Sequence, residues 1–290
     1  MPISYPEILE LRDQTRRFSW DEQDVMLYAL GIGCGADRRH DELKYVQERG
    51  LEVIPTFASV VCWGAGVSPD QMGLNRRQTV HASETVILHR PLPATGSLIS
   101  NARVTAVWDK GKKGAVVDRE IKLTDADTGA PLATIQRTAL ARADGGFGGP
   151  AHAPVLPAIP SHAADRVMRF VTRPEQALLY RLCGDRNPLH AEPAIAAMAG
   201  FPRPILHGLC TLGICCRAVL TAYNEEGFGR LTRFGGRFSG PVFPGEEIEV
   251  LLWRSDNEVA FKAWVPARDA LVISHGQAVF AESDVDEGIL

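Results

Sequence analysis

The segment from Leu209 to Leu220 is apolar on nearly every side, because only Thr211 and Arg217 interrupt it with clearly polar side chains. A helix that is apolar all round belongs in a protein core, and this one is too short to cross a membrane. Three segments rich in β-branched and aromatic residues, separated by turn signals, follow it at 247–253, 259–265 and 271–280. The pattern predicts a buried helix wrapped by an antiparallel sheet.

The first half of the chain repeats this arrangement at a distance of about one domain. The run Pro91–Gly96 (PLPATG) precedes strand-like segments, and Pro241–Gly245 (PVFPG) does the same 150 residues later. The strand-like segments of the first half are 104–108, 116–123 and 132–140. Asp125–Gly129 is a hairpin signal between the last two of them. The length and the repeat together favour two similar domains.

A stretch rich in Gly, Pro and Ala, residues 145–166, has the composition of a linker. The expected division is a first domain over 1–148, a linker over 149–166 and a second domain over 167–290. The sheet of one copy leaves an edge that a second copy can complete. We therefore expect the two halves to form a pseudo-dimer within one chain.

The run LCGDRNPLH at 182–190 carries the chemistry of the second half. It places the carboxylate of Asp185, the carboxamide of Asn187 and the imidazole of His190 within six residues, and its glycine and proline disfavour a plain helix. A carboxylate and an imidazole at one spot can share a water molecule, one taking a proton and the other delivering one. A capping Asp beside a surface His is the simpler reading of either residue alone. The cluster as a whole favours addition or removal of water.

The segments GDRNPLH and PILHGLCTLG, between Tyr180 and Leu220, resemble the signature of the MaoC-like, type 2 (R)-specific enoyl-CoA hydratase family. In the first half, YALGIG, PTFASV, RPLPATG and GGFGG are similar, in that order, to its two-domain members, which include the hydratase portion of the peroxisomal multifunctional enzyme of β-oxidation. The resemblance implies an α+β fold, the double hot-dog, in which each of two repeats wraps an antiparallel sheet around a central helix. It also implies a hydro-lyase of fatty-acid-type metabolism, with reversible syn addition of water to trans-2-enoyl-CoA to give (3R)-3-hydroxyacyl-CoA.

The resemblance assigns catalytic roles to four residues. Asp185 and His190 would activate one water molecule, and the backbone N–H of Gly208 would hold the thioester oxygen as it gains charge. For Asn187, orienting the water and beginning the turn before a proline are equally supported.

It also implies substrate contacts. These are His81, Ala82, Lys110, Arg186, Pro188, Leu189 and Phe238. The family has glycine where this chain has Ala82, which puts a backbone contact there in doubt. Lys110 is almost as well explained as a solvated hairpin lysine, and Phe238 equally well as a core aromatic.

A reduced central helix in the first half of two-domain members leaves room for a bulky acyl chain. Here the corresponding helix would begin near Pro55, and Gly64 and Gly66 would cut it short. Apolar residues near that helix, Phe57, Val60, Val61 and Trp63, are expected to line the space.

Composition limits the other function classes. A net charge of -4 provides no basic field for nucleic acid, and the chain shows no apolar signal core or membrane span. The six cysteines include no CxxC pair and are expected to be reduced core residues. No metal or redox cofactor is expected, since coenzyme A is part of the acyl-CoA thioester substrate. A cytoplasmic location is expected and a homodimer is left open. The alternative functions are a hot-dog acyl-CoA thioesterase and a non-catalytic acyl-CoA-binding protein.

Overall fold

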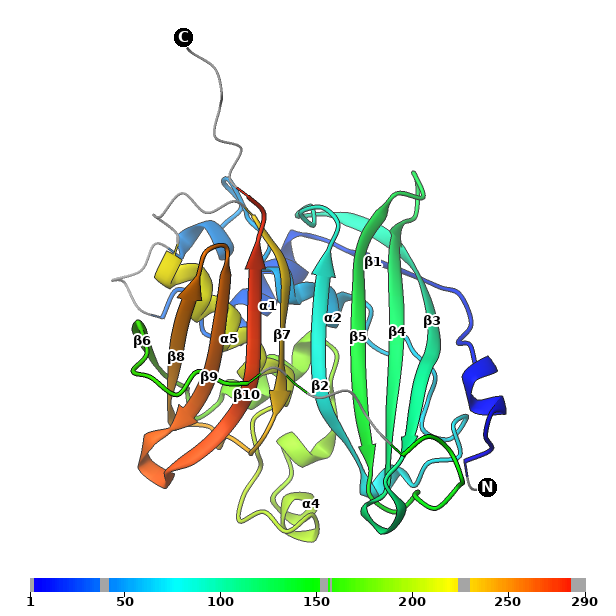
Figure 1. Ribbon diagram of the computed structural model, residues 1–290. Helices are drawn as coiled ribbons and strands as arrows, with labels where there is room; N and C mark the ends of the chain where they lie inside the picture. The colour runs from blue at the N-terminus through cyan, green and yellow to red at the C-terminus, as the bar shows by residue number, and fades with distance from the viewer. Residues whose placement is uncertain (1–2, 37–41, 152–155, 157, 224–229, 283–290) are drawn as a thin grey trace.

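One antiparallel sheet of ten strands dominates the protein, whose computed structural model describes residues 3–36, 42–151, 156, 158–223 and 230–282 (Figure 1). The strands are β1 (Arg16–Trp20), β2 (Thr79–Leu88), β3 (Gly96–Asp109), β4 (Ala115–Asp125), β5 (Pro131–Ala141), β6 (Arg166–Val171), β7 (Leu231–Phe238), β8 (Glu247–Ser255), β9 (Glu258–Val265) and β10 (Ala270–Phe280). Every strand that the sequence predicts lies inside one of these.

Five α-helices are found among the described residues: α1 (Glu22–Gly31), α2 (Ala58–Val61), α3 (Gln176–Tyr180), α4 (Pro193–Met198) and α5 (Gly208–Tyr223). Short 3-10 helices are η1 (Glu7–Glu10), η2 (Leu43–Tyr45), η3 (Pro55–Phe57), η4 (Arg76–Gln78), η5 (Gly111–Lys113), η6 (Arg181–Cys183), η7 (Pro188–His190) and η8 (Pro266–Arg268). Within the described part of the chain, no helix is both long and apolar enough to cross a membrane.

The strand order shows that the two halves are copies of one design. It runs β1-β3-β4-β5-β2-β7-β10-β9-β8-β6. Numbered from its own start, each half has the order 1-3-4-5-2, and the halves meet through their second strands. The β2–β7 ladder runs from Ser83 opposite Arg237 to Ile87 opposite Arg233. The expected pairing of the two halves along a sheet edge is therefore confirmed.

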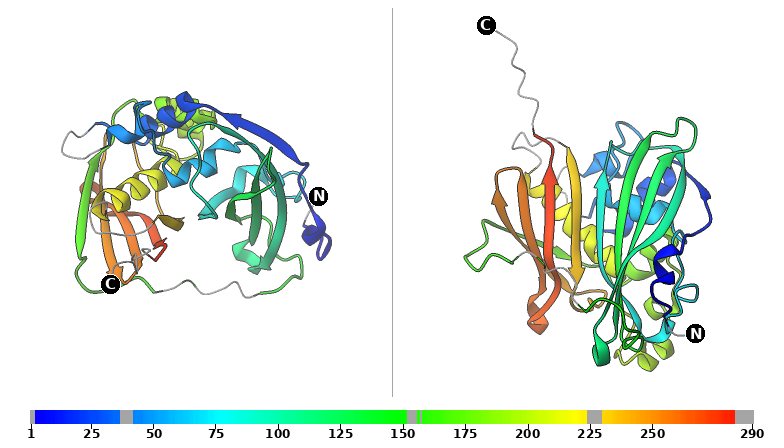
Figure 2. Two further views of the ribbon diagram at one scale, coloured as in Figure 1. Left: turned by 90° about the horizontal axis from the view of Figure 1, so that it is seen from above. Right: turned by 45° about the vertical axis from the view of Figure 1, so that its right-hand side comes forward.

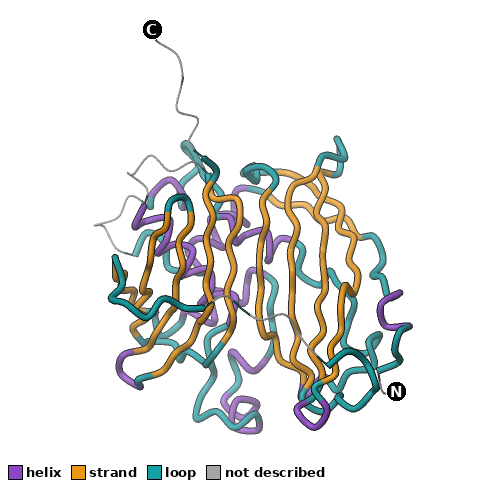
Figure 3. The backbone as a smooth tube through the Cα atoms, in the orientation of Figure 1, coloured by secondary structure: helices purple, strands orange, loops and turns teal. Residues whose placement is uncertain are grey.

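The five α-helices lie on one face of this sheet, as the view from above and the backbone trace show (Figures 2 and 3). Helix α5 is buried over most of its length, as its all-round apolar sequence predicts. The first half has only η3 and α2 in the corresponding place, and α2 ends at Val61, before Gly64 and Gly66. The described parts of the connection between β5 and β6 cross the opposite face of the sheet (Figure 2). The expected short helix in the first half is confirmed.

Buried polar contacts fasten the helices of the two halves together. The carbonyl oxygen of Gly31 in α1 accepts a hydrogen bond from Gln176 Nε2 at 2.7 Å and another from Cys210 Sγ at 3.4 Å. Arg217 of α5 pairs with Glu42, whose Oε2 lies 2.9 Å from Nη2. Both members of this ion pair are buried, so the pair is held in one geometry. The halves form a common core rather than two separate ones.

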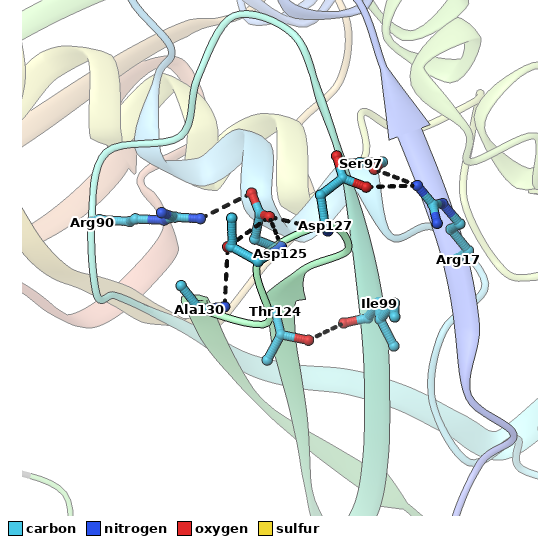
Figure 4. A network of polar contacts seen from close by, with 9 residues as sticks. Arg17, Arg90, Ser97, Ile99, Thr124, Asp125, Asp127 and Ala130 are labelled. Atoms are coloured by element: carbon cyan, nitrogen blue, oxygen red, sulfur yellow. Dashed lines mark hydrogen bonds and ion pairs between the residues drawn. The ribbon is translucent and has the colours of Figure 1, made fainter.

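The predicted hairpin turn between β4 and β5 is fixed by one carboxylate. Asp125 Oδ1 accepts hydrogen bonds from the backbone N–H and the hydroxyl of Thr128, each at 2.8 Å. Its other oxygen accepts one from Arg90 at 3.0 Å, which ties the turn to the PLPATG loop (Figure 4). At the same corner Arg17 of β1 reaches Asp127 at 3.2 Å.

The structure differs from the expected lining of an acyl space. Phe57 and Val60 belong to the common core, where the Phe57 ring meets those of Trp20 and Tyr28. Apolar side chains near a helix are equally suited to core packing, and none of the four residues expected to line the acyl space lines either pocket at the seam between the halves. The expectation of reduced cysteines is confirmed, since all six are free and five are buried.

Candidate active site

The loop that carries Asp185 is shaped by a close contact between the two halves. Gly184 has φ +135°, and a Cβ atom there would lie 2.8 Å from Cγ of Trp63. Only glycine combines this backbone conformation with such a close approach. Trp63 of the first half therefore sets the path of the loop in the second half.

Two side-chain caps hold the next residues. Asp185 Oδ1 accepts a hydrogen bond from the backbone N–H of Asn187 at 3.1 Å, and Asn187 Oδ1 accepts one from the N–H of Leu189 at 3.1 Å. Asn187 thus begins η7, with Pro188 in its first turn. The structure shows the turn role of Asn187, and its amide NH₂ remains for other contacts.

His190 lies at the end of η7 and is buried. Its Nδ1 lies 2.8 Å from the carbonyl oxygen of Ile205. A carbonyl only accepts hydrogen bonds, so Nδ1 carries the proton and Nε2 presents a free lone pair in the neutral ring. Burial lowers the pKa of His190, against the opposing effects of the Ile205 carbonyl and the Asp185 carboxylate. The ring is therefore neutral and basic at Nε2 near pH 7.

A second buried histidine lies against the first. The rings of His190 and His207 are stacked with centroids 3.7 Å apart and planes 26° apart. His207 Nε2 lies 3.1 Å from the backbone oxygen of Asp185, so Nε2 donates and Nδ1 is the bare nitrogen. Burial, and then the proximity of His190, lower the pKa of His207 to about 3. His207 therefore stays neutral, supports the His190 ring and holds the Asp185 backbone.

One carboxylate oxygen of Asp185 and one ring nitrogen each of His190 and His207 lie within 4.8 Å of one another. Two imidazoles and a carboxylate are also a donor set for a transition metal. However, the two rings are stacked, so their lone pairs lie in two nearly parallel planes, which disfavours a common point of binding. The arrangement suits proton transfer between Asp185 and His190 better than a shared metal ion.

Helix α5 begins beside this pair, and its first residue is exposed. A Cβ atom on Gly208 would lie 3.1 Å from Cδ1 of Phe238, so the aromatic ring packs directly against the glycine. The ring of Phe238 meets that of His81 edge-on at 4.8 Å. The structure thus brings Gly208, Phe238 and His81 together, although they come from α5, β7 and β2.

These three residues stand where the seam between the halves opens. The β2–β7 ladder ends at Ser83 and Arg237, and from Thr79 to His81 strand β2 pairs only with β5. A break in register at Ala82 separates His81 from Ser83. Adjacent residues of a strand point to opposite faces, so Arg237 faces away from α5 while Phe238 faces Gly208. His81 and Phe238 therefore flank the end of the seam.

A pocket of about 430 Å³ and another of about 410 Å³ lie at different ends of this seam. The smaller one contains two predicted contact residues, Ala82 and Lys110, and adds the cations Lys113 and Arg237. Leu156 of the connection between β5 and β6 also lines it. Of the predicted residues in the catalytic loop, Arg186 and Pro188 are exposed and Leu189 is half-buried.

Sequence reasoning missed several neighbours of the site. The ring of His207 was visible in the run ILHG, but that run indicated only a helix start. The sequence predicts Trp63 in the lining of an acyl space, whereas in the structure it packs against Gly184. Glu84, which lies 3.0 Å from His81, carried no signal at all.

The fold and the site define a double hot-dog protein. Its sheet consists of two halves with the same strand order, and a carboxylate–imidazole pair lies at the start of a long buried helix. Residues 157–274 match the family described as the MaoC like domain, and residues 18–143 match the MFE-2 hydratase 2 N-terminal domain. The chain belongs to the two-domain form of the MaoC-like, type 2 enoyl-CoA hydratase family.

Relatives align over nearly the whole chain. The enoyl-CoA hydratase ChsH3 of Mycobacterium tuberculosis is 39% identical over 95% of this chain and 98% of its own length. The peroxisomal enoyl-CoA hydratase 2 of Arabidopsis thaliana is 35% identical over 89% of each. Among solved structures, a MaoC-like dehydratase of Phytophthora capsici superposes with a TM-score of 0.85 at 28% identity, covering 96% of this chain and 98% of the other.

Proposed function

We propose that the protein is an (R)-specific 2-enoyl-CoA hydratase that also catalyses the reverse dehydration of (3R)-3-hydroxyacyl-CoA. The observation that carries this proposal is the free Nε2 of His190 beside the Asp185 carboxylate, next to the exposed start of α5. The names of relatives that align over nearly the whole chain, an enoyl-CoA hydratase and a 3-hydroxyacyl-thioester dehydratase, support it.

In this mechanism a water molecule lies between Asp185 and His190. The pair removes one proton from the water as its oxygen bonds to C3 of the enoyl chain. The electrons of the double bond move toward the thioester, and its oxygen gains negative charge opposite the N–H of Gly208 at the positive end of α5. A proton from the pair then adds to C2. Water is consumed and the pair returns to its starting protonation state.

The two halves have different tasks in this proposal. The second half supplies the acid–base pair, and the first half shapes the substrate site. The nucleotide of coenzyme A would occupy the pocket of about 410 Å³, where Lys110, Lys113 and Arg237 can meet phosphates and Trp108 can stack on the adenine. The arm of coenzyme A would then pass alongside His81 and Phe238, whose rings are in contact, to Gly208.

The acyl tail would run toward the pocket of about 430 Å³ at the other end of the molecule. Its apolar lining comes from both halves and includes Tyr45, Val53, Leu88 and Leu220. Leu220 lies twelve residues beyond Gly208 in α5, which corresponds to about 18 Å along the helix. A substrate that fills this space would have a long or bulky tail.

The test is a hydration assay with purified protein and trans-2-enoyl-CoA esters of increasing chain length, with chiral analysis of the product. We expect (3R)-3-hydroxyacyl-CoA and no free coenzyme A. Release of free coenzyme A would instead indicate the thioesterase alternative. Tight binding without turnover of any ester would indicate an acyl-CoA-binding protein.

Assembly and location belong to the same proposal. A homodimer is supported by exposed leucines on neighbouring helices, Leu30 of α1 with Leu178 and Leu182 of α3 and η6. We expect a cytoplasmic enzyme, although some relatives are named peroxisomal. Light scattering gives the mass in solution, and fractionation of the source cells gives the location.

A further inference from the structure

A buried charged network lies behind His81 at the end of the seam. Glu84 is completely buried, and its carboxylate lies 2.7 Å from Nε of Arg137. The same carboxylate lies 3.0 Å from Nε2 of His81. Arg137 also donates a hydrogen bond at 3.0 Å to the carbonyl oxygen of Ser59 in α2. One buried carboxylate therefore links a core arginine to a histidine that reaches the surface.

The charge on Glu84 determines which nitrogen of His81 is available. Burial would raise the pKa of Glu84, but Arg137 and His81 together outweigh it and lower that pKa to about 2. The carboxylate is therefore ionised and can only accept hydrogen bonds. Nε2 of His81 must carry the proton that faces it. In the neutral ring Nδ1 is then an acceptor, and it has no hydrogen-bond partner among the described residues.

The position of His81 indicates which donor its Nδ1 can bind. It stands between Ala82, which lines the pocket proposed for the nucleotide, and Phe238, which packs against Gly208. The arm of coenzyme A carries amide N–H groups, which are donors that match a bare ring nitrogen.

We propose that Glu84 is a positioning residue, which fixes the orientation and tautomer of His81 so that Nδ1 accepts a hydrogen bond from an amide of the pantetheine arm. This inference rests on the proposed function for the identity of the substrate. A buried ion pair is a weak source of stability, and this one also contacts a side chain that reaches the surface. Here it orients the side chain that the substrate arm must pass.

The principal variant is Glu84→Gln, which can donate to Nε2 and so move the proton of His81 to Nδ1. We expect the KM for an enoyl-CoA to rise about 3- to 10-fold, the loss of one hydrogen bond, with kcat within about twofold of wild type. The Kd of a saturated acyl-CoA, measured by calorimetry, should rise by the same factor. The Kd of an acyl-pantetheine, which lacks the nucleotide, should rise by the same factor in Glu84→Gln, because the contact is with the pantetheine arm.

Glu84→Asp controls for a folding defect. Its shorter side chain keeps a negative charge near Arg137 but no longer reaches His81. It should raise KM as Glu84→Gln does. A double-mutant cycle separates positioning from general loosening. If Glu84 acts through His81, adding Glu84→Gln to His81→Ala raises KM no further. If the two effects multiply, the inference is overturned.

The matched control is Glu42→Gln, which removes the charge from the other buried glutamate–arginine pair, Glu42 with Arg217. It should lower the Tm and leave KM and Kd unchanged. An equal rise in KM for Glu42→Gln would also overturn the inference. The acyl-CoA Kd does not require turnover, so failure of the Glu84 variants to change it rejects the inference whether or not the wild type is a hydratase. Absence of hydration by the wild type rejects the proposed function alone.

Discussion

Substitution of Gly208 by alanine should separate activity from stability. The added Cβ would lie 3.1 and 3.2 Å from Cδ1 and Cε1 of Phe238, whereas unstrained carbon contacts are about 3.5–4.0 Å. The ring must therefore yield by a few tenths of an ångström. Crowding of this kind lowers the free energy of unfolding by about 1–3 kcal/mol. Replacing a helical glycine by alanine raises it by up to about 1 kcal/mol. The free energy of unfolding should thus fall by no more than about 3 kcal/mol.

Activity should fall although the protein stays folded, because the methyl group and the displaced ring crowd the N–H proposed to bind the thioester oxygen. Complete loss of an oxyanion-hole donor costs about 10²–10³-fold in kcat. The N–H of residue 208 remains, so we expect a loss of about 10- to 100-fold, followed through the ultraviolet absorbance of the conjugated enoyl thioester. Phe238→Leu combined with Gly208→Ala tests the cause, since it removes the ring that the methyl group crowds but leaves the methyl group beside the N–H of residue 208. Wild-type kcat in Gly208→Ala would refute the oxyanion role of this glycine.

Three further predictions concern the acid–base pair and the acyl pocket. Asp185→Asn and His190→Ala should each lower kcat about 10²–10⁴-fold, and the double variant should lose little more because both residues act on one water; multiplicative losses would contradict this. Folding lowers the pKa values of His190 and His207, so the unfolded chain binds more protons below about pH 6.5. Stability should therefore decrease on acidification, by up to about 1.4 kcal/mol per pH unit for each histidine, and urea unfolding of His207→Phe should show a shallower decrease. Finally, kcat/KM should rise with acyl length by about 0.8 kcal/mol for each buried methylene, and a flat profile would argue against an acyl pocket.

The sequence predicted those parts of the fold that local patterns determine. The all-round apolar character of α5 required burial, and the alternating segments of β3 to β5 and β8 to β10 required a sheet. Strands β2 and β7, which form the seam, were not among the predicted strands. The outermost strands β1 and β6 were not predicted either. Both are short and rich in arginine, and a short polar segment becomes a strand only when a neighbour offers a ladder.

The candidate site also has features that the sequence predicts and features that it does not. Asp185 and His190 are five residues apart, so their proximity could be expected from the sequence. The carbonyl of Ile205, the ring of His207 and the covering of Gly184 by Trp63 depend on chain segments brought together by folding. Glu84 and Arg137 are ordinary charged residues of β2 and β5, and only the strand register makes them a buried pair.

Because the two halves repeat one strand order within a single chain, their sequences can change independently. In a symmetric pair of identical subunits every substitution occurs twice, so a helix shortened to admit ligand would be shortened in both copies. Here the two copies share one chain and are independent in sequence. One could lose most of its helix while the other kept α5 intact, with its acid–base pair. Joining the copies covalently thus allows an asymmetric interior within a symmetric frame.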